Sequence, residues 1–489
     1  MSGDHRVVII GAGFSGLGAA IRLKAARIDD FVVLERADEV GGTWRANSYP
    51  GCQCDVPSHL YSYSFAPNPN WTRTFSHQRE IWDYLRACVE RYGLRPHLRL
   101  GVEVGECAWQ EQAGHWRLET SAGALHANVV IGAMGALSEP SLPALPGIEC
   151  FAGPMFHSAD WRHDVELRGA RVALIGTGAS AIQIAPEIQP VVSELAVYQR
   201  TPPWILPHPD RPISERERAL YRAAPLAQRA MRGAIAWARE AMVLGFRHPW
   251  LSGPGERLAR AHLDRQVADP GMRETLRPAY RLGCKRILIS NRYYPTLMRP
   301  NVTLVPHAVS EIRPHSVVAE DGVERPTDVI VAATGFRVTD SPASHRIRGR
   351  DGRTLAEHWN GSPQAHKGTT IAGFPNLFML LGPHTGLGHT SVLLMIESQI
   401  NYVIGALRVM DARRIGALEP RPAAQAAFVA GVRRRARGTV WESGGCASWY
   451  LDAGGHSVLW PDAAWRFRRA LRRFDLTSYL ARPYSSSSR

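Results

Sequence analysis

Residues 151–161 read Phe-Ala-Gly-Pro-Met-Phe-His-Ser-Ala-Asp-Trp, and they separate two copies of one sequence pattern. In the first copy, the apolar run 7–10 leads into Gly-Ala-Gly-Phe-Ser-Gly at 11–16. In the second, the apolar run 172–175 leads into Gly-Thr-Gly-Ala-Ser-Ala at 176–181. Each copy predicts a buried strand, a glycine turn and a helix whose N-terminus accepts a pyrophosphate. The repetition predicts two dinucleotides that meet face to face.

The length of the chain favours several domains, because 489 residues exceed what one hydrophobic core accommodates. Strand patterns that alternate with helical patterns predict an α/β fold with two Rossmann-like dinucleotide-binding domains. Between residues 210 and 279 the strand pattern stops, which predicts a helical insertion in the second domain. We expect the first domain over 1–150 and 375–489, and the second over 151–209 and 280–374. The tail 484–489 is expected to be disordered.

Composition excludes several classes of protein. The net charge of +14 is compatible with nucleic-acid binding, but the densest basic run, 433–437, lacks interleaved aromatic residues and favours a solvated helix face. The most apolar helical window, 233–246, is interrupted by Arg239 and Glu240 and is too short to cross a bilayer. The first strand begins near Arg6, which leaves no room for a secretory signal. We therefore expect a cytoplasmic protein with no nucleic-acid partner and no membrane span.

Cysteine usage also favours a cytoplasmic protein. The seven cysteines form no Cys-x-x-Cys pair and accompany no His-rich ligand spacing. This pattern favours reduced thiols over a disulfide framework, and it predicts no metal site.

The residue that ends the second strand of each copy differs in charge. Glu35 stands 24 residues after Gly11, where an acidic side chain accepts hydrogen bonds from a ribose diol. Arg200 stands 24 residues after Gly176, where a basic side chain pairs with a 2′-phosphate. The alternatives are an exposed strand-end glutamate and an arginine that flanks the turn at 201–203. The contrast predicts an adenine dinucleotide with a free ribose in the first site and NADP(H) in the second.

Three further segments carry residues suited to a ligand. Residues 41–55 begin with Gly-Gly-Thr-Trp and end, after a Tyr-Pro-Gly turn, at Asp55. The turn presents Asp55 towards a ligand; the alternative is that Asp55 only caps the turn. Residues 283–286, Gly-Cys-Lys-Arg, place a basic pair before an apolar strand, where burial is costly without an anion. Residues 441–450 mix glycines with aromatics, as a closing loop does.

These residues resemble the type I Baeyer–Villiger monooxygenases, a group of class B flavoprotein monooxygenases. The family fingerprint, Phe-x-Gly-x-x-x-His-x-x-x-Trp, matches Phe151, Gly153, His157 and Trp161, although its usual last residue, Pro or Asp, is replaced by Arg162. The longer family motif, Gly-Gly-x-Trp followed by Tyr-Pro-Gly and Asp, is met in full from 41 to 55. The resemblance extends from Val7 to about Tyr479.

The resemblance implies FAD in the first domain, NADPH in the second, and roles for individual residues. Arg286 is expected to be the active-site arginine and Asp55 the carboxylate that positions it. Phe151, Gly153, His157 and Trp161 are expected to form a linker between the domains. The residues expected to bind FAD are Gly11, Gly13, Ser15, Gly16, Glu35, Thr43, Trp44, Asp55, Tyr61, Val104, Met134 and Gly135. Those expected to bind NADP are Gly176, Gly178, Ser180, Ala181, Arg200, Thr201, Lys285, Ala333, Thr334, Gly335 and Trp449.

The resemblance also implies a reaction. Enzymes of this family use NADPH, O2 and a C4a-peroxyflavin to insert one oxygen atom beside a ketone carbonyl, which gives an ester or lactone. Three alternatives stay open on the sequence: a flavin monooxygenase that oxidises sulfides or amines, a flavin-dependent disulfide reductase using Cys52 and Cys54, and a non-catalytic flavin sensor. We expect a monomer or weak homodimer.

Overall fold

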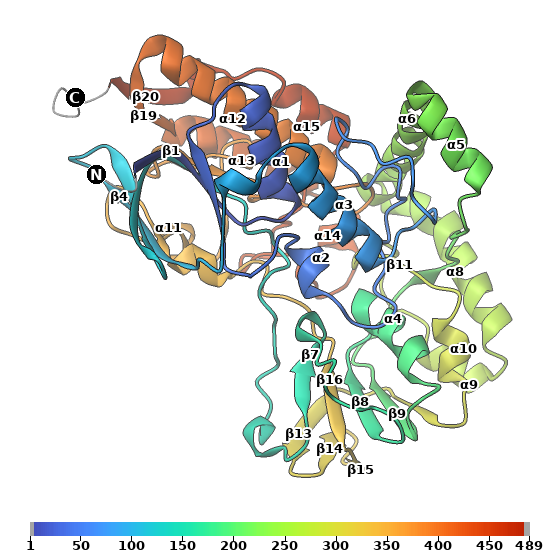
Figure 1. Cartoon of the computed structure of the whole chain (residues 1–489). Coiled ribbons are helices and arrows are strands. Elements are labelled where there is room, and N and C mark those ends of the chain that lie inside the picture. Colours follow the sequence, from blue (N-terminus) through green and yellow to red (C-terminus); the bar gives the residue numbers. More distant parts are fainter. Residues whose placement is uncertain (1–3, 484–489) are drawn as a thin grey trace.

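The computed structural model describes residues 4–483, so the expected disorder of the tail lies outside the described residues. Figure 1 shows two sheet-centred bodies, the first built from both ends of the chain and the second from its middle. The first sheet has eight strands in the order β17-β4-β5-β6-β1-β2-β3, and β18 pairs with β6. Its strands are β1 (Asp4–Ile10), β2 (Phe31–Glu35), β3 (Leu98–Leu100), β4 (Val104–Gln110), β5 (His115–Thr120), β6 (Gly123–Gly132), β17 (Ile347–Arg348) and β18 (Leu377–Met379).

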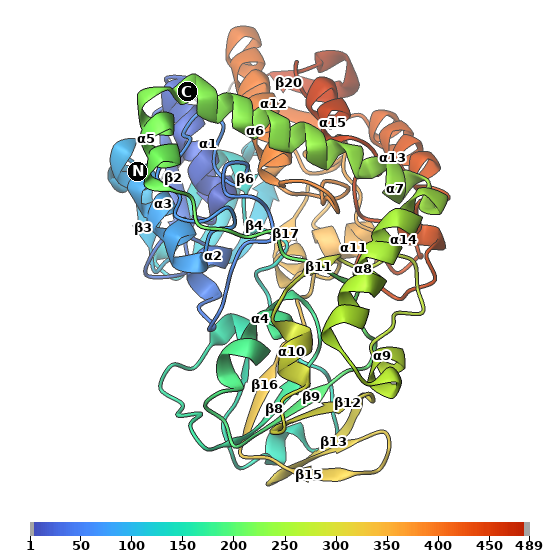
Figure 2. The ribbon, with the colours of Figure 1, turned by 90° about the vertical axis from the view of Figure 1, so that its right-hand side faces the viewer.

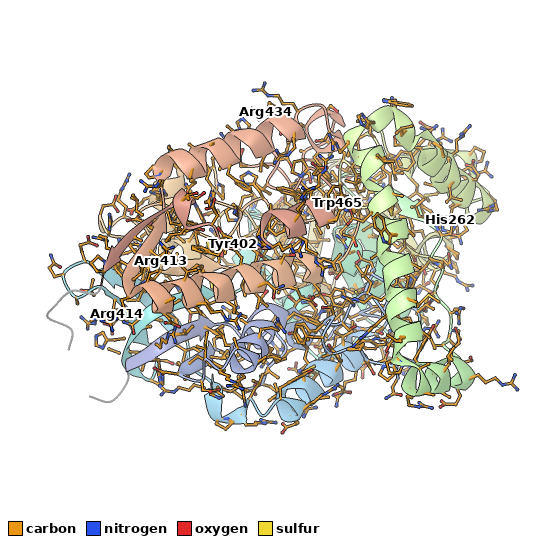
Figure 3. The ribbon with its side chains drawn as sticks, turned by 90° about the horizontal axis from the view of Figure 1, so that it is seen from above. His262, Tyr402, Arg413, Arg414, Arg434 and Trp465 are labelled. Carbon is orange, nitrogen blue, oxygen red and sulfur yellow. A yellow bond between two sulfur atoms is a disulfide. The ribbon has the colours of Figure 1, made fainter. Side chains whose placement is uncertain are left out.

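Helices cover this sheet because its central strands are apolar and buried. Val7 and Ile9 of β1 are fully buried and belong to the main core cluster. The helices of this body are α1 (Phe14–Ala25), α2 (Thr43–Ala46), α3 (Gln78–Arg91), α11 (Leu355–Trp359), α12 (Leu393–Arg413), α13 (Pro422–Ala436), α14 (Val440–Ser443) and α15 (Ala464–Ala470). Figure 3, seen from above, shows Arg413 at the end of the long helix α12. The first body also contains an antiparallel strand pair, β19 (Ile415–Pro420) and β20 (Tyr479–Pro483).

The second body repeats the plan around a smaller sheet. Its five parallel strands run in the order β12 (Val302–Val305), β9 (Glu194–Tyr198), β8 (Arg171–Ile175), β16 (Val329–Ala332) and β7 (Met155–His157). An antiparallel sheet of β13 (Val309–Arg313), β14 (Ser316–Ala319) and β15 (Glu324–Pro326) adjoins it. Helices α4 (Ala179–Ile188) and α10 (Tyr293–Leu297) pack on it, and β10 (Ile205–Leu206) pairs with β11 (Leu288–Ile289).

The two glycine turns have the same local geometry. Gly11 has φ 104°, and a Cβ on it would lie 2.7 Å from the Ala133 carbonyl oxygen. Gly176 has φ 112°, and a Cβ there would lie 2.5 Å from the Ala333 oxygen. Both positions therefore require glycine, because the turn passes directly against the chain that leaves the neighbouring strand. The fold is thus α/β with two Rossmann-like units, as expected.

The insertion is helical, as expected, and it contacts the first body closely. Its helices are α5 (Glu215–Ala223), α6 (Pro225–Ala241), α7 (Val243–Arg247), α8 (Gly253–Gln266) and α9 (Pro270–Thr275). Figure 2 shows α6 as a long green helix that crosses the first body. Arg232 of α6 donates hydrogen bonds of 3.0 Å to the His59 carbonyl and 2.9 Å to the Ser62 carbonyl. The insertion therefore bridges the two bodies.

One expected boundary needs correction. We expected residues 280–374 in the second domain, but β17 pairs with β4 of the first sheet, with Ile347 opposite Cys107. Leu355 and Phe374 also belong to the core cluster that lies against the first sheet. The chain has therefore returned to the first body by Ile347. The sequence hides this return, because β17 is only two residues long.

Two features are absent from the residues that the structure describes. Within residues 4–483, no helix is long and apolar enough to cross a membrane. Over the same range, no group of His, Cys, Asp and Glu side chains is arranged to hold a metal ion.

Candidate active site

A half-buried ion pair joins the two bodies. Arg286 Nε donates to Asp55 Oδ2 at 2.7 Å, and Arg286 Nη2 donates to Asp55 Oδ1 at 2.6 Å. Burial by itself raises the pKa of Asp55, but the charge and hydrogen bonds of Arg286 lower it below its ordinary value. The Asp55 charge in turn raises the pKa of Arg286. Asp55 thereby holds the planar guanidinium of Arg286, with its permanent positive charge, in a fixed orientation.

The loop that carries Asp55 is fixed against the second nucleotide unit. Tyr49 donates from its hydroxyl to the side-chain oxygen of Gln183 on α4 at 3.0 Å, and Gln183 Nε2 donates to the Gln53 carbonyl at 3.0 Å. A Cβ on Gly51 would lie 2.8 Å from the Gln183 carbonyl oxygen. The Tyr-Pro-Gly turn therefore serves a contact between the two bodies. Sequence reasoning missed Gln183, since nothing local relates residue 183 to residue 49.

A second arginine adjoins the pair. Arg239 on α6 donates from Nη2 to the Asp55 carbonyl at 3.2 Å. Burial lowers the pKa of Arg239, the Asp55 charge raises it, and the Arg286 charge lowers it. Sequence reasoning used Arg239 only to exclude a membrane span. The signal that could have identified Arg239 as a site residue is its charge within an otherwise apolar helical window.

The closing loop reaches the ion pair through Tyr450. Burial raises the pKa of Tyr450, and the charge of Arg286 partly offsets that effect. Trp449, which we expected to cover NADP, is 45% exposed and packs edge-to-face on Tyr450 with ring centroids 4.3 Å apart. The residue of this loop that lies beside Arg286 is therefore Tyr450.

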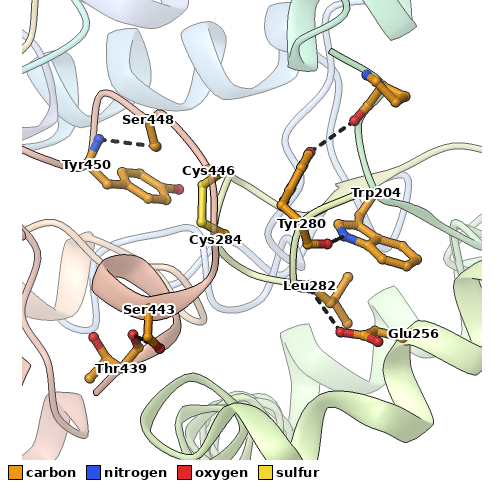
Figure 4. Close-up of a disulfide and its surroundings, with 11 residues drawn as sticks. Trp204, Glu256, Tyr280, Leu282, Cys284, Thr439, Ser443, Cys446, Ser448 and Tyr450 are labelled. Carbon is orange, nitrogen blue, oxygen red and sulfur yellow. Dashed lines mark hydrogen bonds between the residues drawn. A yellow bond between two sulfur atoms is a disulfide. The ribbon is translucent and has the colours of Figure 1, made fainter. Parts of the chain in front are cut away.

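A disulfide ties this loop to the basic pair. Cys284, directly before Lys285, is bonded to Cys446, 162 residues later in the sequence (Figure 4). Gly444 allows the approach, because a Cβ there would lie 2.8 Å from Cys284 Sγ. Our expectation that all cysteines are reduced thiols was wrong for these two. Local spacing does not reveal a bond between cysteines that only the fold brings together.

The remaining cysteines have free thiols. Cys52 and Cys54 are buried and are not bonded to each other. Burial raises the pKa of Cys52 to about 12, which keeps its thiol protonated and unreactive. A redox pair at these two positions is therefore not supported.

The first glycine turn has the features of a flavin-nucleotide site. The N-terminus of α1 at Gly13 carries no side-chain cap, and a Cβ on Gly13 would lie 3.5 Å from the Gly42 Cα. Glu35, at the end of β2, accepts hydrogen bonds from the N–H groups of Ala12 at 2.7 Å and Ala37 at 3.0 Å. Its carboxylate is thereby oriented beside the turn.

Other residues expected around FAD gather near this turn. Trp44 Nε1 donates to the Tyr61 hydroxyl at 3.0 Å. Val104 lies two residues after Val102, whose N–H donates to the Glu35 carbonyl at 2.9 Å. The remaining expected positions lie in the turns, in the first turn of α1 or at the start of α2: Gly11, Ser15, Gly16, Thr43, Met134 and Gly135.

Two buried polar atoms in the segment between β18 and α12 also suit a ligand. His384 Nδ1 and Thr390 Oγ1 are buried without a hydrogen-bond partner in the part of the chain that the structure describes. Such atoms normally have partners, so a ligand with several donors and acceptors suits them. The residues present therefore fit FAD.

The second glycine turn fits NADP. The N-terminus of α4 at Gly178 lacks a side-chain cap, and a Cβ on Gly178 would meet open space. Burial lowers the pKa of Lys285, and repulsion from Arg200 lowers it further. Two cations that feel each other's charge, and an uncapped helix N-terminus, each suit a phosphate. Thr177 bonds the Thr201 carbonyl at 3.1 Å, and Thr334 bonds the Ser141 carbonyl at 2.5 Å.

The other positions expected around NADP line the same turn. Ser180 and Ala181 belong to the first turn of α4, and Ala333 donates its N–H to the Ile175 carbonyl at 2.9 Å. Gly335, with φ 87°, accepts a hydrogen bond from the Ser141 N–H at 2.9 Å.

The fingerprint is integrated into the second sheet. Its strand β7 pairs in parallel with β16, and a Cβ on Gly153 would lie 2.2 Å from the Asp328 carbonyl oxygen, with the Phe151 ring also adjacent. His157 Nδ1 accepts a hydrogen bond from the Ala159 N–H at 3.0 Å. Burial lowers the pKa of His157. Trp161 packs edge-to-face on Phe156 at 5.2 Å. The segment is thus an edge strand, and just beyond it His163 contacts Ser48 of the first body at 2.8 Å.

The fold and site define a two-nucleotide oxidoreductase. The model of the flavin-binding monooxygenase-like family matches residues 4–211. A Baeyer–Villiger monooxygenase of Streptomyces coelicolor is 53% identical over 479 residues, which cover 97% of this chain and 92% of the relative.

Solved structures of similar enzymes have the same fold. A cyclohexanone monooxygenase of Rhodococcus sp. Phi1 bound to NADP+ superimposes with a TM-score of 0.87 at 29% identity, covering 99% of this chain and 100% of that one. An OTEMO complex with FAD and NADP has a TM-score of 0.89 at 25% identity, with the same coverage. This chain belongs to the Baeyer–Villiger monooxygenases.

Proposed function

We propose that the chain oxidises a ketone to an ester or lactone, with NADPH as the reductant and O2 as the source of the inserted oxygen atom. The observation that carries the proposal is the bidentate pair of Arg286 and Asp55 between the two nucleotide units. An enzyme that only oxidises soft sulfides or amines has less need of such a pair, since no anionic adduct forms on the substrate.

When bound, the two cofactors would supply the redox chemistry: NADPH would provide the hydride and FAD the means to activate O2. In our proposal the turn at 11–16, Glu35, Trp44 and Tyr61 hold FAD. The turn at 176–181, Arg200 and Lys285 hold NADPH. The opposite charges of Glu35 and Arg200 support placing the phosphorylated ribose in the second site.

Arg286 is proposed to stabilise negative charge where it develops. A nucleophilic oxygen attacks a ketone only as an anion, and the addition leaves charge on the former carbonyl oxygen. The guanidinium of Arg286 does not lose its proton, so it meets that charge at any working pH. Asp55 fixes the guanidinium plane, and Arg239 holds the Asp55 backbone. We propose Asp55 and Arg239 as positioning residues.

The loop 441–450 is proposed to exclude water from this charge. Tyr450 is buried beside Arg286, and the disulfide holds the loop near Lys285. A drier site strengthens every electrostatic interaction within it. The aromatic residues Phe246 and Trp441, with ring centroids 5.5 Å apart, are proposed to line the substrate side.

The test is a panel of ketones and sulfides supplied to the purified enzyme. NADPH consumption is compared with the ester, sulfoxide and hydrogen peroxide formed. The proposal predicts ester formation that accounts for most of the NADPH consumed with at least one ketone. Sulfoxide formation alone, with no ester from any ketone, would contradict it. We further propose that the enzyme works in the cytoplasm, where NADPH is supplied, as a monomer or weak homodimer.

A further inference from the structure

A basic groove lies away from the two glycine turns, between the end of α1, the middle of α12, and α15 with the residues that follow it. We name it the arginine groove, and it has a volume of about 940 Å³. Trp465 of α15, labelled in Figure 3, is one of its lining residues. Six arginines line it: Arg22, Arg408, Arg468, Arg469, Arg472 and Arg473. No carboxylate of the described chain is among its lining residues.

The positive charge of the arginine groove is not neutralised from within the molecule. Arg22 is held by a 3.4 Å hydrogen bond to Asn401 and lies over the Phe65 ring. The other five side chains make no hydrogen bond or ion pair with any residue between 4 and 483. Six guanidinium groups around one recess repel one another, and an anionic ligand among them would reduce this repulsion. The groove therefore suits a ligand with several negative charges.

Aromatic and neutral polar side chains complete the lining. Trp465 is 45% exposed at the groove, and the Phe474 ring is half-buried there. Ser398 and Asn401 supply hydrogen-bonding groups without charge. An exposed indole beside arginines is what a base needs for stacking, while the guanidinium forks match phosphate oxygens.

The shape distinguishes between kinds of anion. A volume of about 940 Å³ lies within the range of small-ligand pockets. A bilayer surface contacts projecting side chains, whereas these arginines line a recess between three helices. We propose that the arginine groove binds a nucleotide with two or more phosphate groups, separately from the two dinucleotide sites.

The test uses the enzyme with FAD bound and saturated with NADP+, so that both dinucleotide sites are filled. Binding of ATP, AMP and inorganic tripolyphosphate is measured by titration calorimetry. The proposal predicts that ATP binds about tenfold or more tightly than AMP, because each added phosphate gains charge-assisted hydrogen bonds. Arg469→Ala/Arg472→Ala should weaken ATP binding by about tenfold or more for the same reason.

Two further variants separate the parts of the proposal. Trp465→Ala should weaken ATP by about tenfold while leaving tripolyphosphate unchanged, because only the base stacks. Arg216→Ala/Arg257→Ala removes the same charge from exposed positions on α5 and α8 and should change nothing. All of these side chains are exposed, and unchanged FAD content confirms that each variant folds.

Several results would overturn the proposal. They are no binding of ATP to the wild type at millimolar concentration, equal binding by the Arg469/Arg472 variant, or equal weakening by the Arg216/Arg257 control. Tighter binding of single-stranded DNA than of ATP would replace the nucleotide with a nucleic acid. Ester formation by the same preparations is measured separately, so failure here leaves the proposed oxidation intact.

Discussion

Arg286 and Asp55 form a two-bonded pair across the two nucleotide units, with Nε–Oδ2 and Nη2–Oδ1 distances of 2.7 and 2.6 Å. Asp55 comes from a loop of the first body, and Arg286 follows the helical insertion of the second. The pair therefore forms only when both bodies are in place. It couples the relative position of the two cofactors to the geometry of one positive charge.

The first prediction concerns pH. Arg286 lowers the pKa of Asp55 in the folded protein despite burial. A lowered carboxyl pKa gives stability above the unfolded-state value, about pH 4, and that stability is lost as the pH falls through the folded-state value. Asp55→Asn should therefore have a lower Tm than the wild type at neutral pH, and the difference should shrink in acid. A difference in Tm that stays constant down to about pH 3 would contradict this account.

The second prediction concerns the nicotinamide cofactor. Arg200→Ala/Lys285→Ala should raise the KM for NADPH by about tenfold or more and change the KM for NADH little, because only NADPH carries the 2′-phosphate. Steady-state kinetics with both cofactors measures the ratio. Arg216→Ala/Arg257→Ala removes two exposed cations elsewhere and serves as the control. An unchanged NADPH-to-NADH preference in the Arg200/Lys285 variant would remove the assignment.

The sequence predicted the parts of the molecule that local chemistry determines. The two strand–glycine–helix units follow from residues within about twenty positions of one another, and Glu35 and Arg200 fall in the same register. The pairing of Asp55 with Arg286 came from the family resemblance, since 231 residues separate them. The Gln183 contact, the docking of α6 and the return at Ile347 depend on tertiary packing. No local pattern marks such contacts.

A third prediction concerns the fingerprint. His157→Ala and Trp161→Ala should keep FAD bound but slow flavin reduction or turnover, because β7 ends beside the Gly335 turn and precedes the contact of His163 with Ser48. His157→Asn retains an acceptor for the Ala159 N–H and should recover most of the rate. Stopped-flow reduction by NADPH is the measurement. Wild-type rates of flavin reduction and turnover in both alanine variants would mean that the segment has only a packing role.

A fourth prediction concerns the disulfide. Cys446→Ser, or a dithiol reductant that converts the bond to two thiols, should loosen the loop that carries Tyr450. Water then reaches the site more often, so the amount of hydrogen peroxide released per NADPH consumed should rise. Cys284→Ser/Cys446→Ser should resemble either single variant, since one bond is lost in each case. Cys150→Ser, which changes an exposed free thiol, is the control. The same peroxide share with and without the bond would show that the tether has no effect on coupling.

The measurement that tests the central claim most directly is product analysis of Arg286→Ala, with ester quantified by gas chromatography and hydrogen peroxide followed in parallel. The variant should fold, bind FAD and still be reduced by NADPH, because Arg286 is not among the residues assigned to either nucleotide. The rate of ester formation should fall by about 10²–10³ or more, as when one oxyanion-stabilising group is removed. The electrons of NADPH should then reduce O2 to hydrogen peroxide instead. Arg286→Lys should recover little, because a point charge does not reproduce the planar fork held by Asp55. Ester formation at the wild-type rate by Arg286→Ala would contradict the account.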